Sequence, residues 1–243
     1  MNLSHTENLT IKCYETDIKS NLTPFAFMNL AQEMANTHAA MISFGYDDLI
    51  SNNLTWVLSR VRIKFLNTPK WRDQVTFESW HKGNDGLFAM RDFLMCDPLG
   101  NPMIVATSYW LIINIESRRI QRTDHVPGYS ESKAVNPRNA MEERCEKITP
   151  PEEIELHHEH TIQYSDLDVV GHTNNAKYLE WAVNCIDFAT ILEKEPKEIE
   201  LNFNLESKLG EKISIYRGSI SDNIKYIEGK REDKSIFQAR IRV

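Results

Sequence analysis

The architecture of this chain follows from residues 23–45, which read TPFAFMNLAQEMANTHAAMISFG. Thr23 is a good helix cap, and Pro24 suits a first turn in which no amide hydrogen is needed. Apolar side chains then recur at helical spacing around much of the circumference. A helix that is apolar on most sides is normally buried on several of them. We therefore predict a buried helix over residues 25–44, which Gly45 ends.

Strand-like runs surround this helix in the first half of the chain. A short run precedes it at residues 9–14, and the run after it, residues 54–65, alternates apolar and polar side chains toward its end. Further runs lie at residues 74–81, 87–96 and 103–115. Turn-forming residues separate them at 82–86 and 98–101. The pattern predicts one helix followed by an antiparallel meander.

The second half of the chain repeats this order of elements. A charged stretch with several prolines, residues 130–155, separates the halves and is typical of a connection between domains. Thr173 follows Thr23 by 150 residues, and a second helix pattern comes after it. On this alignment Leu22 takes the place of His172. An internal repeat is the simplest account of the pattern.

A mostly apolar helix followed by an antiparallel sheet is buried when the sheet curls around it. That arrangement is the hotdog fold, and the repeat implies that it occurs twice. We therefore predict the α+β class with tandem hotdog domains, each a long central helix wrapped by a curved antiparallel sheet. The expected boundaries are 1–130 for the N-terminal domain, 131–155 for the linker and 156–243 for the C-terminal domain.

The composition is that of an ordinary globular protein, with 41% apolar and 26% charged residues among 243. A net charge of −7 disfavours nonspecific binding to nucleic acid or to anionic membranes. The first ten residues have neither a basic region nor an apolar run, so we expect no signal peptide. The four cysteines are scattered, without metal-ligand spacing. A reducing, cytoplasmic location is the simplest expectation.

The chemistry-bearing residues gather in residues 164–181, YSDLDVVGHTNNAKYLEW, where a strand gives way to a helix. Gly171 allows a backbone conformation that other residues resist. Thr173 or Asn174 can cap the helix, whose first amides then point at whatever lies in front of it. These donors and the positive end of the helix dipole suit an oxygen that becomes negative during a reaction.

This segment resembles the acyl-ACP thioesterase family, the plant FatA/FatB enzymes and their bacterial relatives. The family motif reads roughly D-x-N-x-H-x-N-N-x-K-Y. It is matched here by Asp168, His172, Asn174, Asn175, Lys177 and Tyr178. The resemblance covers nearly the whole chain. It implies a double hotdog enzyme that releases free fatty acid from acyl–acyl carrier protein without a cofactor, with its chemistry in the C-terminal half and its acyl chain held by the N-terminal half.

The resemblance also places an acidic residue on the following strand, at Glu206, often with a cysteine beside it. Here that neighbour is Ser207, and the motif's first asparagine is Val170. These two departures weaken a mechanism in which a thiolate attacks the carbonyl. We therefore expect direct attack by water, with Glu206 or Asp168 as the base.

The remaining roles follow from this scheme. His172 donates to the thioester oxygen or positions the water. Asn174, Asn175 and Ser207 are predicted to position the substrate and its oxyanion. Three other functions stay open: an acyl-CoA thioesterase with the same chemistry, a non-catalytic acyl-thioester-binding hotdog protein, and a hydratase of the same fold.

The expected partner is acyl carrier protein, with no nucleic acid or membrane partner, and the chain is expected to be a monomer or a homodimer. Because acyl carrier proteins are acidic, docking calls for a local basic surface. Two clusters qualify, although a solvated strand face explains each of them better. They are Arg60, Arg62, Lys64, Lys70 and Arg72, and Arg118, Arg119 and Arg122.

A histidine-rich run, HHEH, occupies residues 157–160. In a regular strand neighbouring side chains point to opposite faces, so His157 and His158 are expected to diverge. We therefore predict no metal site and no metal cofactor.

Overall fold

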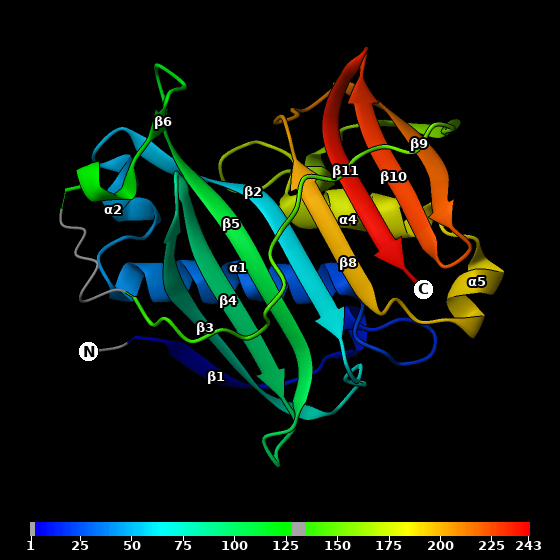
Figure 1. Ribbon diagram of the computed structural model, residues 1–243, viewed down its shortest axis with the longest axis horizontal. Helices are drawn as coiled ribbons and strands as arrows, with labels where there is room; N and C mark the ends of the chain where they lie inside the picture. Colours follow the sequence, from blue (N-terminus) through cyan, green and yellow to red (C-terminus); the bar gives the residue numbers. More distant parts are fainter. Residues whose placement is uncertain (1–2, 128–134) are drawn as a thin grey trace. The chain divides into compact units, whose positions relative to one another are not determined.

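The computed structural model describes residues 3–127 and 135–243 (Figure 1). It divides into two compact units. Unit 1 contains the residues up to Ser59 and residues 65–145. Unit 2 contains Arg60–Lys64 and Glu146–Val243. Each unit places one main helix against an antiparallel sheet, which agrees with the predicted tandem hotdog architecture.

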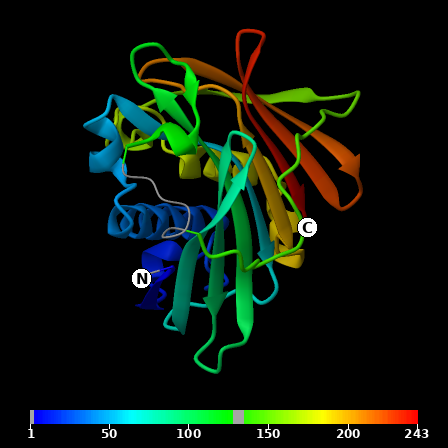
Figure 2. The same ribbon diagram turned by 60° about the vertical axis from the view of Figure 1, so that its left-hand side comes forward.

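Unit 1 has the sheet order β1-β3-β4-β5-β2, and the short strand β6 pairs with β5. Its strands are β1 (His5–Thr10), β2 (Leu54–Phe65), β3 (Gln74–Asp85), β4 (Phe88–Cys96), β5 (Pro102–Asn114) and β6 (Ile120–Gln121). Its helices are α1 (Pro24–Met41) and α2 (Tyr46–Ile50). Helix α1 packs against β3 (Figures 1 and 2). Phe27 on this helix is fully buried against Phe65 and Phe77.

Helix α1 begins as predicted, because the Thr23 hydroxyl accepts a hydrogen bond from the Ala26 amide at 3.3 Å. Its predicted end is wrong by three residues: the helix stops at Met41, and Gly45 caps α2 instead. The predicted turn at 82–86 is also too long, because β3 continues to Asp85 through a bulge before Gly83. No helix in the described part of the chain is both long and apolar enough to cross a membrane.

Unit 2 has the sheet order β8-β11-β10-β9-β7, all antiparallel, and residues 60–64 of β2 pair with β8. Its strands are β7 (Glu155–Thr161), β8 (Glu198–Phe203), β9 (Lys212–Ser221), β10 (Ile224–Arg231) and β11 (Lys234–Arg242). Its helices are α4 (Asn175–Asn184) and α5 (Phe188–Glu193). Helix α4 packs on β10 and β11 but has only 10 residues against 18 in α1, so the second central helix is shorter than predicted.

The repeat is visible in the loop that leads into each main helix. In unit 1 the Asp17 amide donates to the Asn21 carbonyl, and in unit 2 the Asp168 amide donates to the His172 carbonyl. Asn21 is therefore the counterpart of His172, and the predicted match with Leu22 is wrong by one residue. Backbone pairing sets this register, and weak side-chain similarity did not reveal it.

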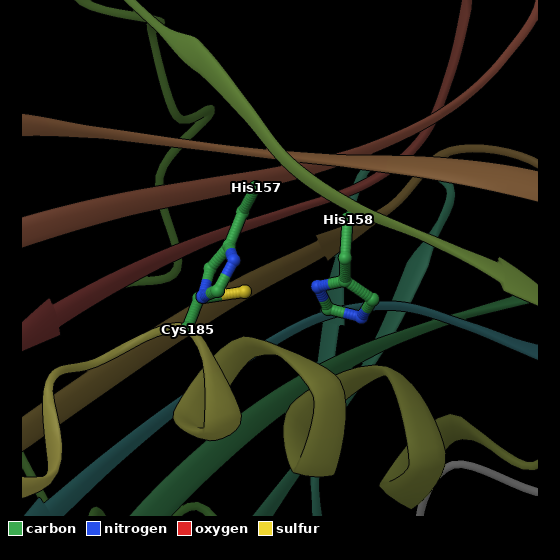
Figure 3. A group of neighbouring side chains, drawn as sticks. All are labelled: His157, His158 and Cys185. Atoms are coloured by element: carbon green, nitrogen blue, oxygen red, sulfur yellow. The ribbon is translucent and has the colours of Figure 1, made fainter.

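Strand β7 departs from the regular alternation that the sequence suggested. Its pairing with β9 shifts register between Leu156 and His158, which makes His157 an extra, bulged residue. The rings of His157 and His158 consequently lie together, with centroids 5.1 Å apart. Figure 3 shows both rings extending toward Cys185 at the end of α4. The expectation that these two histidines diverge was wrong.

Candidate active site

The loop before α4 is organised by the carboxylate of Asp168. Its Oδ1 atom accepts hydrogen bonds from the amides of Val170 at 3.0 Å and His172 at 3.1 Å. Gly171 has a φ of +79°, which places it in the left-handed region where glycine is favoured. Together these features reverse the chain and present His172 just ahead of the helix.

A second loop, between β8 and β9, lies against this one. The Thr173 amide donates to the Ser207 carbonyl at 2.9 Å, and His172 forms an isolated bridge with Lys208. This pairing brings the predicted Glu206 beside the predicted histidine, with Nε2 of His172 3.6 Å from Oε2 of Glu206. Both side chains are about one-quarter exposed, 26% and 27%, so water can reach the pair.

Ser207 is fully buried under these loops. Its hydroxyl lies 2.8 Å from the Thr173 hydroxyl and 2.7 Å from the Tyr178 hydroxyl. Burial raises the pKa of Tyr178, which keeps that phenol protonated as a hydrogen-bond partner. The arrangement favours a role for Ser207 in holding the loop to the helix over direct contact with a substrate.

Asn174 is the N-cap of α4, as predicted. Its side chain accepts from the Ala176 amide at 2.9 Å, and its own amide donates to the Asp166 carbonyl at 2.8 Å. Both groups therefore have partners inside the protein, while Asn175 is the first residue of the helix. A contact of Asn174 or Asn175 with the substrate oxyanion stays a prediction.

Two residues that hold the loops of this site were not predicted from the sequence. His160 on β7 donates from Nε2 to Asp166 at 2.8 Å, and its ring packs on Trp181. Arg231 on β10 donates to the Glu206 carbonyl at 3.3 Å and forms an ion pair with Glu211. His160 was visible only as part of the HHEH run. Arg231 had no local signal, because strand pairing alone brings it to this loop.

The arrangement suits acid–base work on a bound carbonyl compound. A carboxylate and an imidazole lie side by side at a partly exposed position, and the start of a helix lies next to them. A carboxylate can take a proton from water, and an imidazole can donate one or hold the water in place. This geometry supports hydrolysis by water.

Comparison with known proteins places the chain in a family. A model of the acyl-ACP thioesterase N-terminal domain matches residues 2–126, and a model of the C-terminal domain of the same enzymes matches residues 149–242. The chain belongs to the acyl-ACP thioesterase family. The family resemblance seen in the motif around His172 is therefore confirmed over both halves of the chain.

Individual relatives agree with this assignment. The chain is 29% identical over 220 residues to an oleoyl-acyl carrier protein thioesterase of Coriandrum sativum chloroplasts, which covers 84% of this chain and 57% of that protein. It therefore spans less than three-fifths of the length of this acyl-ACP thioesterase.

Solved structures of the family share the fold. An acyl-ACP thioesterase from Bacteroides thetaiotaomicron superposes with a TM-score of 0.85 at 25% identity, covering 99% of this chain and 98% of that one. A 12:0-ACP thioesterase from Umbellularia californica superposes with a TM-score of 0.86 at 23% identity, covering 100% and 97%. These likenesses confirm the double hotdog fold.

Proposed function

We propose that this chain hydrolyses fatty acyl thioesters of acyl carrier protein, releasing free fatty acid and the carrier thiol. The observation that carries the proposal is the approach of His172 to Glu206, 3.6 Å apart at a partly exposed position in a chain of the acyl-ACP thioesterase family. Membership of the family and the names of its relatives supply the substrate class.

In the proposed mechanism Glu206 takes a proton from a water molecule as the water oxygen attacks the thioester carbon. The carbonyl electron pair moves onto oxygen, where His172 and donors at the start of α4 stabilise it. Collapse of this intermediate breaks the carbon–sulfur bond, and the thiolate takes up the proton. General acid–base assistance contributes about 10²–10⁴-fold and one oxyanion donor about 10²–10³-fold. Since a thiolate leaves readily, no covalent intermediate is required.

We assign the base role to Glu206 and a positioning role to Asp168. Oδ1 of Asp168 is occupied by two backbone amides of its own loop. In unit 1, Asp17 accepts hydrogen bonds from the amides of Lys19 and Asn21 in the same way, although that loop carries no histidine. Because the equivalent carboxylate binds loop amides in both repeats, we assign Asp168 a structural role in its loop and not a role as the base.

Unit 1 is proposed to hold the acyl chain and to contribute no chemistry. The position equivalent to His172 is Asn21, which is buried. The chemistry is therefore assigned to the C-terminal hotdog unit alone.

The acyl carrier is the part of the proposal that needs a direct test. Part of one predicted basic cluster is engaged within unit 2, because Arg62 donates to Glu198 at 2.6 Å and residues 60–64 pair with the acidic strand β8. Lys70 and Arg72 of this cluster are exposed in unit 1, as are Arg118 and Arg119 of the second cluster. The acyl-carrier-protein assignment depends on the family.

The test is release of free thiol from matched acyl-ACP and acyl-CoA substrates over a graded series of chain lengths. The proposal predicts faster turnover of acyl-ACP, with free fatty acid as the product. A strong preference for acyl-CoA would show that acyl carrier protein is not the carrier. Binding of the acyl thioester without turnover, or hydration of its acyl chain at C2–C3, would show that the chain is not a thioester hydrolase.

A further inference from the structure

Three metal-ligating side chains meet in unit 2 away from the His172–Glu206 pair. One nitrogen of His157, one of His158 and the sulfur of Cys185 all lie within 4.8 Å of one another. Figure 3 shows the two rings on β7 and the sulfur at the end of α4 turned toward a common point. The strand and the helix thus contribute to one cluster.

The bulge in β7 makes this convergence possible. In a regular strand His157 and His158 would point to opposite faces of the sheet. The extra residue in the pairing with β9 places both rings on the helix side. Bulges recur where a strand re-aims a side chain at a site, and they are features of a fold rather than defects.

We propose that His157, His158 and Cys185 bind a divalent zinc ion, with solvent as the fourth ligand. Two imidazoles and a thiolate form a donor set of borderline softness that suits this ion. With Zn–N near 2.0–2.1 Å and Zn–S near 2.3 Å, tetrahedral ligand atoms lie about 3.5 Å apart. The observed separations of up to 4.8 Å then need to close by about 1 Å. Side-chain rotation of His157, which is exposed, can supply much of that movement.

The electrostatic setting suits a cation. Cys185 is the C-cap of α4, where the negative end of the helix dipole favours positive charge. Arg217 on β9, a cation that acts on Cys185, is paired with both Glu155 and Asp187. Its charge is therefore largely compensated.

Binding exchanges a proton for the metal. Without metal, the Cys185 thiol donates to the Trp181 carbonyl at 3.3 Å. When the sulfur–zinc bond forms, the S–H bond breaks and one proton leaves to solvent.

The bound ion would fasten β7 to the end of α4. Strand β7 is the last in the sheet order of unit 2, and among the described residues it pairs with β9 alone. A metal that binds the folded chain stabilises it by mass action. This role is independent of thioester hydrolysis.

Cobalt titration of the full chain, purified without a histidine tag and freed of metal with a chelator, tests the site. We expect one Co²⁺ per chain, a sulfur-to-cobalt charge-transfer band and the visible bands of a tetrahedral ion, all removed by zinc. Cys185→Ser should abolish the charge-transfer band, whereas Cys13→Ser, at an exposed cysteine, should keep it. His157→Ala should weaken binding on the order of tenfold or more. His125→Ala, at an exposed histidine of unit 1, should leave binding unchanged.

Absence of the charge-transfer band in the wild-type chain would overturn the proposal. So would a band that survives Cys185→Ser, or equal weakening by His157→Ala and His125→Ala. If Cys185→Ser fails to fold because this cysteine is buried, the exposed His157 decides the question alone.

Discussion

Ser207 is the residue whose chemistry the structure constrains most closely. Its hydroxyl is buried and lies within hydrogen-bond distance of the Thr173 and Tyr178 hydroxyls, away from solvent. This position explains how serine can stand where the family often has cysteine without providing a nucleophile. What the position requires is a small polar group that ties two loops together.

Ser207→Ala should therefore keep substantial activity while lowering the free energy of unfolding by about 1–3 kcal/mol, because two buried hydroxyls lose a partner. Steady-state turnover of acyl-ACP and chemical denaturation measure the two effects. Ser165→Ala, at an exposed serine of the loop before α4, is the control and should change neither. An acyl group trapped on Ser207 would contradict the water mechanism.

His81 in unit 1 makes stability depend on pH. Burial, with the nearby Arg91 cation, lowers its pKa from 6.5 to about 4. Well above pH 6.5 the ring is neutral in both folded and unfolded chains, and its contribution to stability is fully present. As the pH falls toward 4 the unfolded chain takes up a proton first, so this contribution, about 3 kcal/mol, is progressively lost.

His81→Asn should accordingly flatten the acid side of the stability curve between pH 6.5 and 4, since asparagine cannot titrate. Denaturant unfolding at several pH values measures the slope. His125→Asn, at an exposed histidine, should leave the slope as in the wild type. Identical curves for the wild type and His81→Asn would refute the assignment.

The loops before α1 and α4 are structural elements that allow a matched pair of experiments. Asp17 and Asp168 each accept two amides of their own loop, but only the second loop carries His172. Asp168→Asn and Asp17→Asn should both lower stability by a similar amount, about 1–2 kcal/mol. Only Asp168→Asn should also lower kcat on acyl-ACP.

Thermal unfolding and kcat, measured on both variants, separate loop building from chemistry. Equal loss of kcat in the two variants would mean that stability, and not the position of His172, sets the rate. Unchanged kcat in Asp168→Asn would remove Asp168 from the account altogether.

Local signals predicted some elements and not others. The Thr23 cap and the proline after it mark the start of α1, because a cap acts within one turn. The register of the repeat and the bulge at His157 depend on which strand lies alongside, as do Arg231's contacts with Glu206 and Glu211. The pairing of segments that are distant in sequence cannot be predicted from the local sequence of either segment. The site motif was found because Asp168, His172 and Asn174 lie within one loop.

At the scale of the whole molecule, two copies of one plan have come to differ in a few side chains. Unit 2 brings together His172 and Glu206, and unit 1 has Asn21 where that histidine would stand. The fold class could be predicted because helix and strand patterns occur twice in the sequence. Glu206 could be placed beside His172 only through the family resemblance, since they lie 34 positions apart in the sequence.

In the proposed mechanism, His172 and Glu206 act as one unit on the attacking water. The most direct measurement is kcat on acyl-ACP for His172→Ala, Glu206→Gln and the double variant, with thermal unfolding as a check on folding. Each single variant should lose about 10²–10⁴-fold, and the double variant should lose little more than the worse single one, because residues that act together are not additive. Full activity in Glu206→Gln, or losses that multiply in the double variant, would contradict the account.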